Sequence, residues 1–265
     1  VNSVSSAITQ AIASQGQVLL AGDVRFEFNN RFATPEELKH FQGLGDVSLS
    51  SSLRSMARLP DGSDQTLVEA KGVDGAYPLY GTLGTSPQQP SATLFAKEGE
   101  RYGAVVAPLL LDRLGIAVGD EILLGTVRLK ITATLVREPD AVSEGFGFAP
   151  RLMISEEALQ ASGLVQTGSL VENAYRIRLA DTGTPLSKVR ADATEAFPKA
   201  GWSIRTSNSA APSLTNNITR FSQFLTLVGL TALIVGGVGV ANAVRAYLDS
   251  KRSVIATFKC LGAPR

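Results

Sequence analysis

The chain contains few of the side chains that enzymes most often use for chemistry. Its 265 residues include one cysteine and one histidine, and aromatic residues make up 6% of the chain. The histidine, His40, is expected on a short surface helix, where a lone histidine is more often solvated than catalytic, and no serine in a nucleophile elbow accompanies it. The cysteine, Cys260, lies near the C-terminus, so the preceding region has no disulfide. We predict no catalytic residue and no cofactor.

Signatures of nucleotide, nucleic-acid and metal binding are also missing. There is no Walker motif, so any process driven by ATP needs another chain. Basic residues are scattered and aromatic residues are few, which argues against nucleic acid as a partner. Three acids, Glu138, Asp140 and Glu144, follow a predicted strand but lack the spacing of a calcium loop, and we interpret them as a solvated turn. No metal site is predicted.

A long uncharged hydrophobic segment lies near the C-terminus. From Phe224 to Val244 only two threonines and one asparagine interrupt the run. At about 1.5 Å of rise per residue, such a helix crosses the roughly 30 Å hydrocarbon core of a bilayer. A buried helix of a soluble domain is the alternative, but such helices rarely sustain so long an uncharged run. We predict a transmembrane helix over residues 221–246.

The charges that flank this segment predict its orientation. Five cations follow it against the single acid Asp249: Arg245, Lys251, Arg252, Lys259 and Arg265. By the positive-inside rule residues 245–265 are cytoplasmic and residues 1–220 lie on the other side. The chain begins at Val1 without a methionine and stops soon after the predicted span. We therefore expect a fragment that lacks an earlier span before Val1 and further spans after Arg265.

Small residues recur at helical spacing inside the predicted span. They are Ala232, Gly236, Gly237, Gly239, Ala241 and Ala243. Such faces let helices approach closely in lipid, which implies other spans or a second copy of the protein as partners. A dinucleotide-binding glycine loop is not supported, because no strand precedes the cluster and no acid follows at the required spacing. A simple single-pass anchor stays open as the alternative.

The region before residue 208 has the pattern of two β-α-β units with an insertion between them. The first unit is predicted to have a strand over 18–28, a helix from Thr34 to about Phe41, and strands over 47–59 and 67–73. The second is predicted to have a strand over 174–179, a helix over 185–197 and a strand over 202–206. Two such units suggest a ferredoxin-like or split β-α-β sandwich. A short helix is also expected over 4–12, and the insertion has strands over 121–124 and 127–136.

These patterns together predict an α+β fold in five parts. The parts are a sandwich over 1–60 and 170–207, an inserted β-rich subdomain over 61–169, a linker over 208–220, the span over 221–246 and a cytoplasmic helix over 247–265. Two phenylalanines, Phe146 and Phe148, stand in a glycine-rich loop of the insertion. They are candidates for contact with a substrate or partner, because apolar side chains in a polar loop are unusual.

Short motifs along nearly the whole chain resemble one family of membrane proteins. The tail from Lys251 to Ala263 is similar to the segment that follows the second span of FtsX-like and MacB-like ABC transporter permeases. Further motifs look like the YbbP-type branch of that family: Gly22-Asp23, Lys71-Gly72-Val73-Asp74, Tyr77-Pro78-Leu79-Tyr80-Gly81, Leu114-Gly115, Val118-Gly119-Asp120, Glu138-Pro139-Asp140, Pro150-Arg151 and Gly163-Leu164-Val165-Gln166 with Gly168-Ser169. Each motif is weak alone, and their order and spacing make the match specific.

The resemblance implies a non-catalytic permease subunit of the bacterial inner membrane, with a porter-like and an inserted Sabre-like part in the periplasm. It implies a separate ATPase subunit, a lipophilic substrate and a periplasmic partner protein. The tail would be the helix that couples the permease to the ATPase, through Lys251, Arg252, Ile255, Phe258, Lys259 and Leu261. The family often has glutamate where this chain has Val254, so the matching salt bridge is not carried over. A single-pass periplasmic sensor or binding module is the alternative, and a tethered periplasmic enzyme is a weaker one.

Overall fold

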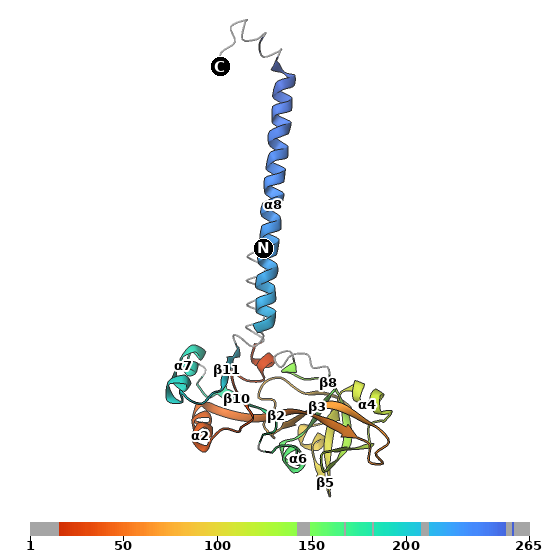
Figure 1. Cartoon of the computed structure of the whole chain (residues 1–265). Coiled ribbons are helices and arrows are strands. Elements are labelled where there is room, and N and C mark those ends of the chain that lie inside the picture. The colour runs from red at the N-terminus through yellow and green to blue at the C-terminus, as the bar shows by residue number, and fades with distance from the viewer. Residues whose placement is uncertain are drawn as a thin grey trace. The chain divides into compact units, whose positions relative to one another are not determined.

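The computed structural model contains two compact units (Figure 1). One comprises residues 11–211, and the other comprises residues 1–10 and 212–265. The structure describes residues 16–141, 149–166, 168–181, 183–207, 212–252 and 256. The first unit is a mixed sheet domain with short helices, and the second is dominated by one long helix. An α+β domain followed by a long apolar helix was the predicted fold class, and it is confirmed.

The first part of the sheet domain is a split β-α-β sandwich. Its elements are β1 (Val24–Asn29), α2 (Pro35–Leu44), β2 (Gly45–Arg58), β10 (Glu172–Leu179), α7 (Leu186–Ala196) and β11 (Ser203–Thr206). The strands follow the order β11-β1-β10-β2, and each neighbouring pair is antiparallel. This is the order that two interleaved β-α-β units produce. Phe26, Phe41 and Trp202 pack together in the core between the sheet and its helices.

The start of α2 shows how local sequence fixes this architecture. The Thr34 hydroxyl accepts a hydrogen bond from the Glu37 backbone N–H, and the Glu37 carboxylate accepts one from the Thr34 N–H, which forms a capping box. Pro35 occupies the first turn, where its missing N–H is not needed. The Arg31 guanidinium donates to the Glu37 carboxylate at 2.8 Å and holds the pKa of Glu37 below its ordinary value. The helix is thereby fixed at its first turn, and Phe41 is directed into the core.

The insertion continues the same sheet beyond β2. Its elements are β3 (Gln65–Val73), β4 (Gly84–Ser86), α3 (Ser91–Leu94), β5 (Lys97–Glu98), β6 (Arg101–Val106), α4 (Pro108–Leu114), β7 (Glu121–Leu124), β8 (Val127–Arg137), β9 (Arg151–Ser155) and α6 (Glu156–Ala161). β7 pairs with both β8 and β2, so the ring β2-β3-β9-β6-β8-β7 closes on itself as a barrel. Closure leaves these strands without an open edge.

Strand β2 belongs to both parts of the domain. Its first half, Gly45 to Ser52, pairs with β10 of the sandwich, and its second half, Ser50 to Arg58, pairs with β3 of the barrel. The barrel interior holds apolar side chains such as Leu53, Ile122 and Leu152, with Leu110 of α4 packed against them. The two predicted subdomains therefore share one continuous strand.

The structure differs from the predicted elements in three ways. The expected strand over 18–28 begins only at Val24, because residues 16–20 are helical and a turn with positive φ at Ala21 separates them from β1. Several elements of the insertion were not predicted at all: β4, α3, β5, β6, α4, β9 and α6. The helix α8 (Pro212–Ser250) begins inside the range expected to be a linker. The helix expected over 4–12 lies outside the described residues.

Candidate functional site

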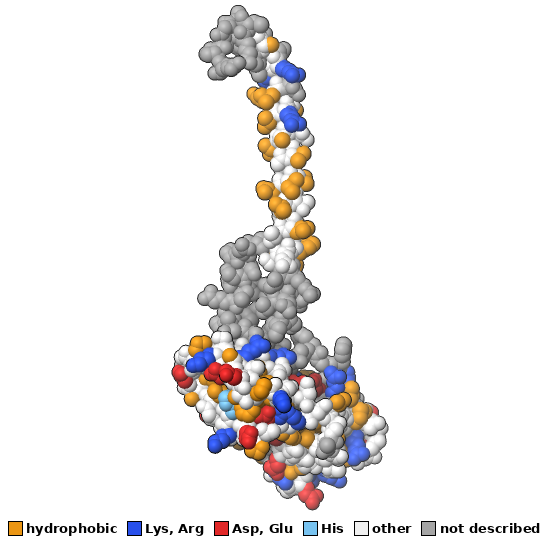
Figure 2. Space-filling view, turned by 60° about the vertical axis from the view of Figure 1, so that its left-hand side comes forward, with side chains coloured by type: hydrophobic (Ala, Val, Ile, Leu, Met, Phe, Trp, Pro, Cys, Tyr) orange, Lys and Arg blue, Asp and Glu red, His pale blue; other side chains and the backbone are white. Residues whose placement is uncertain are grey.

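The helix α8 is the first feature with a functional meaning. Its segment Phe221–Leu248 is long and apolar enough to cross a membrane, judged by length and composition. The large apolar side chains of this segment are exposed within the chain, and Figure 2 shows them along the helix with Lys and Arg near one end. A helix of a soluble domain would bury the apolar side chains of one of its faces against the rest of the domain. The segment is therefore a candidate membrane span, in agreement with the sequence prediction.

The two threonines of the span are satisfied within the helix. The Thr226 hydroxyl donates to the carbonyl oxygen of Ser222 and the Thr231 hydroxyl to that of Leu227, each at 2.9 Å. This back-bonding leaves neither hydroxyl proton without an acceptor in an apolar surrounding. These two threonines are thus compatible with a lipid environment.

The predicted small residues of the span fall on two sides of the helix. At about 100° per residue, Ala232, Gly236, Gly239 and Ala243 lie within an arc of about 60°, whereas Gly237 and Ala241 lie on the other side. A Cβ added at Gly236, Gly237 or Gly239 would meet no atom within 4 Å. Glycine in a helix interior is unfavourable by about 1 kcal/mol relative to alanine, and nothing in the described part of this chain requires it here. A partner outside the chain would explain the small residues.

The predicted coupling tail is only partly described. α8 ends at Ser250, and the N–H of Lys251 still bonds to the carbonyl oxygens of Tyr247 and Leu248. Lys251 and Arg252 are exposed. The other predicted coupling residues lie outside the described residues: Ile255, Phe258, Lys259 and Leu261. Phe146 and Phe148 do so as well, so the roles of both groups stay predictions.

A buried ion cluster lies where the sandwich and the barrel meet. The Lys71 ammonium contacts Glu138 at 2.7 Å and Asp140 at 2.9 Å. Asp140 also accepts hydrogen bonds from the Arg176 guanidinium and the Tyr77 hydroxyl. The side chains of Lys71, Asp140 and Arg176 are fully buried. The interpretation of this segment as a solvated turn is therefore wrong for Glu138 and Asp140, and Glu144 lies outside the described residues.

The charge state of Asp140 follows from its surroundings. Burial alone would raise the pKa of its carboxyl group, but the charges of Arg176 and Lys71 and the Tyr77 hydroxyl outweigh burial and hold the pKa well below its usual range. Lys71 belongs to β3 of the barrel and Arg176 to β10 of the sandwich. The Asp140 carboxylate thus joins the two parts by a buried ionic contact. This contact can stabilise the placement of the two parts relative to one another.

His40 and the acidic side chains are the groups that a catalytic or metal-binding site would use. The His40 ring packs edge-on against Phe197, with ring centroids 5.4 Å apart. Within the described residues, no group of three or more His, Cys, Asp or Glu side chains is arranged to hold a metal ion. The His40 ring therefore packs within the sandwich, with its Nε2 atom buried instead of solvated as expected.

The combination of a domain outside the candidate span, the span itself and cations after it is typical of a membrane protein subunit. Sequence comparison makes this class more specific. The chain is 28% identical over 268 residues to the uncharacterized ABC transporter permease YbbP of Escherichia coli strain K12. The alignment covers 99% of this chain and 31% of the relative, so the chain spans about a third of that protein. The resemblance to an ABC transporter permease that the sequence motifs indicated is confirmed.

Solved structures give weaker similarities. The periplasmic region of MacB from Actinobacillus actinomycetemcomitans is 8% identical with a TM-score of 0.49, covering 76% of this chain and 96% of that one. The extracellular domain of the transporter YknZ from Gram-positive bacteria is 10% identical with a TM-score of 0.44, covering 69% of this chain and 100% of that one. No protein-family model matches the chain. With TM-scores below 0.5, neither structure carries weight for function.

Proposed function

We propose that the chain is part of the permease subunit of a bacterial ABC transporter of the MacB/FtsX type, and that this subunit moves or extracts a lipophilic substrate. The observation that supports this most is the similarity to a permease along 99% of the chain. The apolar helix α8 adds to it, because a permease requires membrane spans. Residues 1–220 would lie in the periplasm and the tail in the cytoplasm, since the cations after the span follow the positive-inside rule.

The proposed mechanism is mechanical, with ATP hydrolysis in a separate subunit. The sequence offers no Walker motif, so the energy has to reach the permease through contacts. The residues Ile255, Phe258 and Leu261 recur at helical spacing and would dock on the ATPase, with Lys251 and Arg252 supplying cations for an acidic surface. Movement of this tail would pass along the adjoining span to the periplasmic domain.

The small-residue faces of α8 would pack against other spans of the permease or against a second permease copy. Close approach of helix backbones is what glycine and alanine permit in lipid. A rigid contact of this kind is required if the helix is to transmit force. Phe146 and Phe148 would contact the lipophilic substrate or a periplasmic partner protein, because their loop carries apolar side chains among polar ones.

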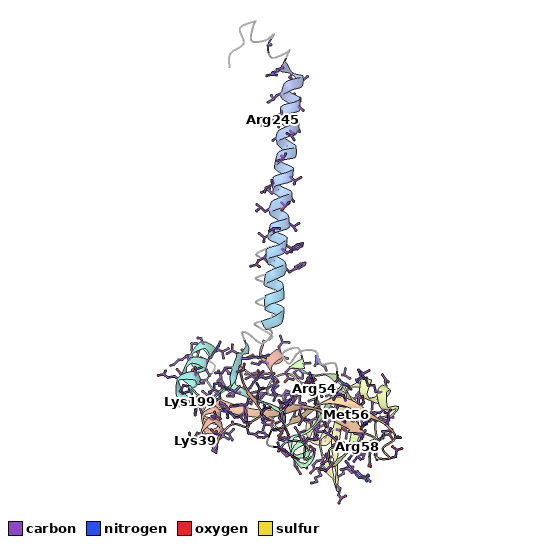
Figure 3. The ribbon with its side chains drawn as sticks, in the orientation of Figure 1. Lys39, Arg54, Met56, Arg58, Lys199 and Arg245 are labelled. Carbon is purple, nitrogen blue, oxygen red and sulfur yellow. The ribbon has the colours of Figure 1, made fainter. Side chains whose placement is uncertain are left out.

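The proposal is tested with the full-length permease copurified with its ATPase subunit. The variant Phe258→Glu places a charge in the proposed docking face, and we expect it to abolish association or to lower permease-stimulated ATP hydrolysis at least about tenfold, a change of 1.4 kcal/mol or more. The control is Lys199→Glu, which changes an exposed residue of the sheet domain (Figure 3). Normal coupling in Phe258→Glu would instead favour a single-pass periplasmic sensor or binding module.

A further inference from the structure

Two neighbouring hollows on the sheet domain are not explained by a role in force transmission. One has a volume of about 810 Å³ and extends from the end of β1 across β2 and β3 to the chain segment before β10. The other, of about 300 Å³, lies beside it. Both are lined by Asn30, Ser169 and Val171, so the two hollows meet along these residues. Volumes of this size are typical of binding sites.

The larger hollow holds a cation without a counter-charge. Arg54 is exposed, and no ion pair of its guanidinium is found among the described residues. Glu69 stands directly opposite Arg54 in the sheet, but its carboxylate faces the Arg151 guanidinium at 3.4 Å. The other acid of the hollow, Glu172, contacts Arg25 at 2.9 Å. The unmatched charge of the hollow is therefore positive, which favours an anionic group on the ligand.

The smaller hollow holds a buried acceptor without a donor. Asn173 lines it and is 1% exposed; its amide nitrogen donates to the carbonyl oxygen of Arg31 at 2.8 Å, but its amide oxygen accepts no hydrogen bond. A buried acceptor left unpaired costs about 1–3 kcal/mol, so an N–H group from a ligand would be favourable here. Asn30, on the wall that both hollows share, has a positive φ of 62°, which asparagine adopts more readily than most other residues.

Apolar side chains complete the surface. Leu170 lines the larger hollow and is 83% exposed. Met56 follows two residues after Arg54 and therefore lies on the same face of β2, and it pairs across the sheet with Leu67. Met56 is 41% exposed and Leu67 46%. Large apolar side chains that stay this exposed next to a hollow indicate contact with a partner.

We propose that the two hollows form one groove that binds an extended peptide segment of a partner protein, with a carboxylate close to apolar side chains. Arg54 would pair with the carboxylate in a bidentate contact, and Leu170 would cover the apolar side chains. Asn173 would accept a backbone N–H. A peptide fits better than a lipid, because Asn30 and the unpaired amide oxygen of Asn173 give a peptide backbone partners that an acyl chain cannot use. This function does not depend on coupling to an ATPase.

The test uses the whole chain in neutral-lipid nanodiscs and an array of labelled decapeptides that contain leucine with glutamate, glutamine or lysine at the same positions. We expect the glutamate peptides to bind best, and to bind more weakly as ionic strength rises. Arg54→Glu should weaken the binding of the glutamate peptides at least about tenfold, and the variant should bind the lysine peptides better than the glutamate peptides. Arg58→Glu is the matched control, because Arg58 is exposed on the same face of β2 but does not line either hollow.

Three results would overturn the proposal. The first is equal binding of the glutamate and lysine peptides to the unchanged chain. The second is an equal effect of Arg54→Glu and Arg58→Glu, which would mean that net charge alone governs binding. The third is displacement of bound peptide by oleate with no selection among peptides, which would identify a lipid groove. Leu170→Asp gives an independent check, since Leu170 is exposed and its replacement leaves the core intact.

Discussion

At the scale of single residues, Asp140 is the position with the largest expected effect. Asp140→Asn keeps the side-chain shape but leaves Arg176 and Lys71 buried without its negative charge. Breaking a buried ion pair by removing one partner typically destabilises a protein by about 3–5 kcal/mol. We expect the free energy of unfolding to fall by that amount at neutral pH. It is measured by urea unfolding, with the fluorescence of Trp202 as the signal. Asp46→Asn, in an exposed pair with Arg178, is the control and should change little.

The same variant has a diagnostic pH dependence. The pKa of Asp140 is lower in the folded than in the unfolded chain, so its stabilisation is complete above about pH 4 and is lost as the pH falls toward the folded-state value. The unfolded chain takes up this proton first, which lowers stability by about 1.4 kcal/mol per pH unit. Asp140→Asn lacks this contribution. The difference in unfolding free energy between the variant and the unchanged chain should therefore shrink below about pH 4. A difference that stays constant down to pH 3 would contradict a charged, buried Asp140.

The sequence contained one signal for this cluster that the predictions did not use. Lys71 lies inside a strand that is otherwise apolar toward its end, and a lysine in a buried strand requires a counter-charge. Glu138 and Asp140 were recognised as a group of acids, but their partner Lys71 is 67 and 69 residues away from them, and Arg176 is 36 residues away from Asp140. Sequence spacing alone could not show this pairing. The acids were therefore interpreted from local context, which favoured a solvated turn.

At the scale of elements, prediction succeeded where the signals are local. The N-cap Thr34 and Pro35 located the start of α2, and alternating or apolar runs located β2, β3, β7, β8 and β10 close to their observed bounds. It failed where tertiary contacts decide, and it also missed α4, although Pro108 at its start and Gly115 at its end are local signals. β9 is short and pairs with β3 and β6, which are distant in sequence. Closure of the barrel by β7 has no local signature either.

The packing role of α8 leads to a prediction at the same scale. Gly236→Leu would insert a large side chain into the face formed by Ala232, Gly236, Gly239 and Ala243, and overpacking of a helix contact costs about 1–3 kcal/mol. We expect the full-length permease to aggregate in detergent at a lower temperature, measured by fluorescence-detected size exclusion. Val238→Leu, about 130° around the helix from the centre of this face, is the control. Equal effects of the two substitutions would mean that this face is not the packing face.

At the scale of the whole molecule, the chain combines a stiff domain with a helix suited to lipid. The sandwich and the barrel share β2 and are joined by the buried Asp140 contacts, so the sheet domain is built to move as one body. Such a body transmits displacement better than two loosely linked parts. This is the property that the proposed mechanical role needs, and it rests on the connection between the two parts rather than on any catalytic group.

The orientation of the chain can be tested at this scale with its single cysteine. If the tail is cytoplasmic, a membrane-impermeant maleimide should label Cys260 in cells only after the inner membrane is opened. Ser63→Cys in a Cys260→Ser background places a thiol in the exposed turn between β2 and β3, and it should be labelled once the outer membrane alone is permeabilised. The opposite pattern would place the cations after the span outside the cytoplasm. A tail in that position could not reach a cytoplasmic ATPase, so the proposed coupling would have to be abandoned, whereas the proposed groove would stand and would face the cytoplasm.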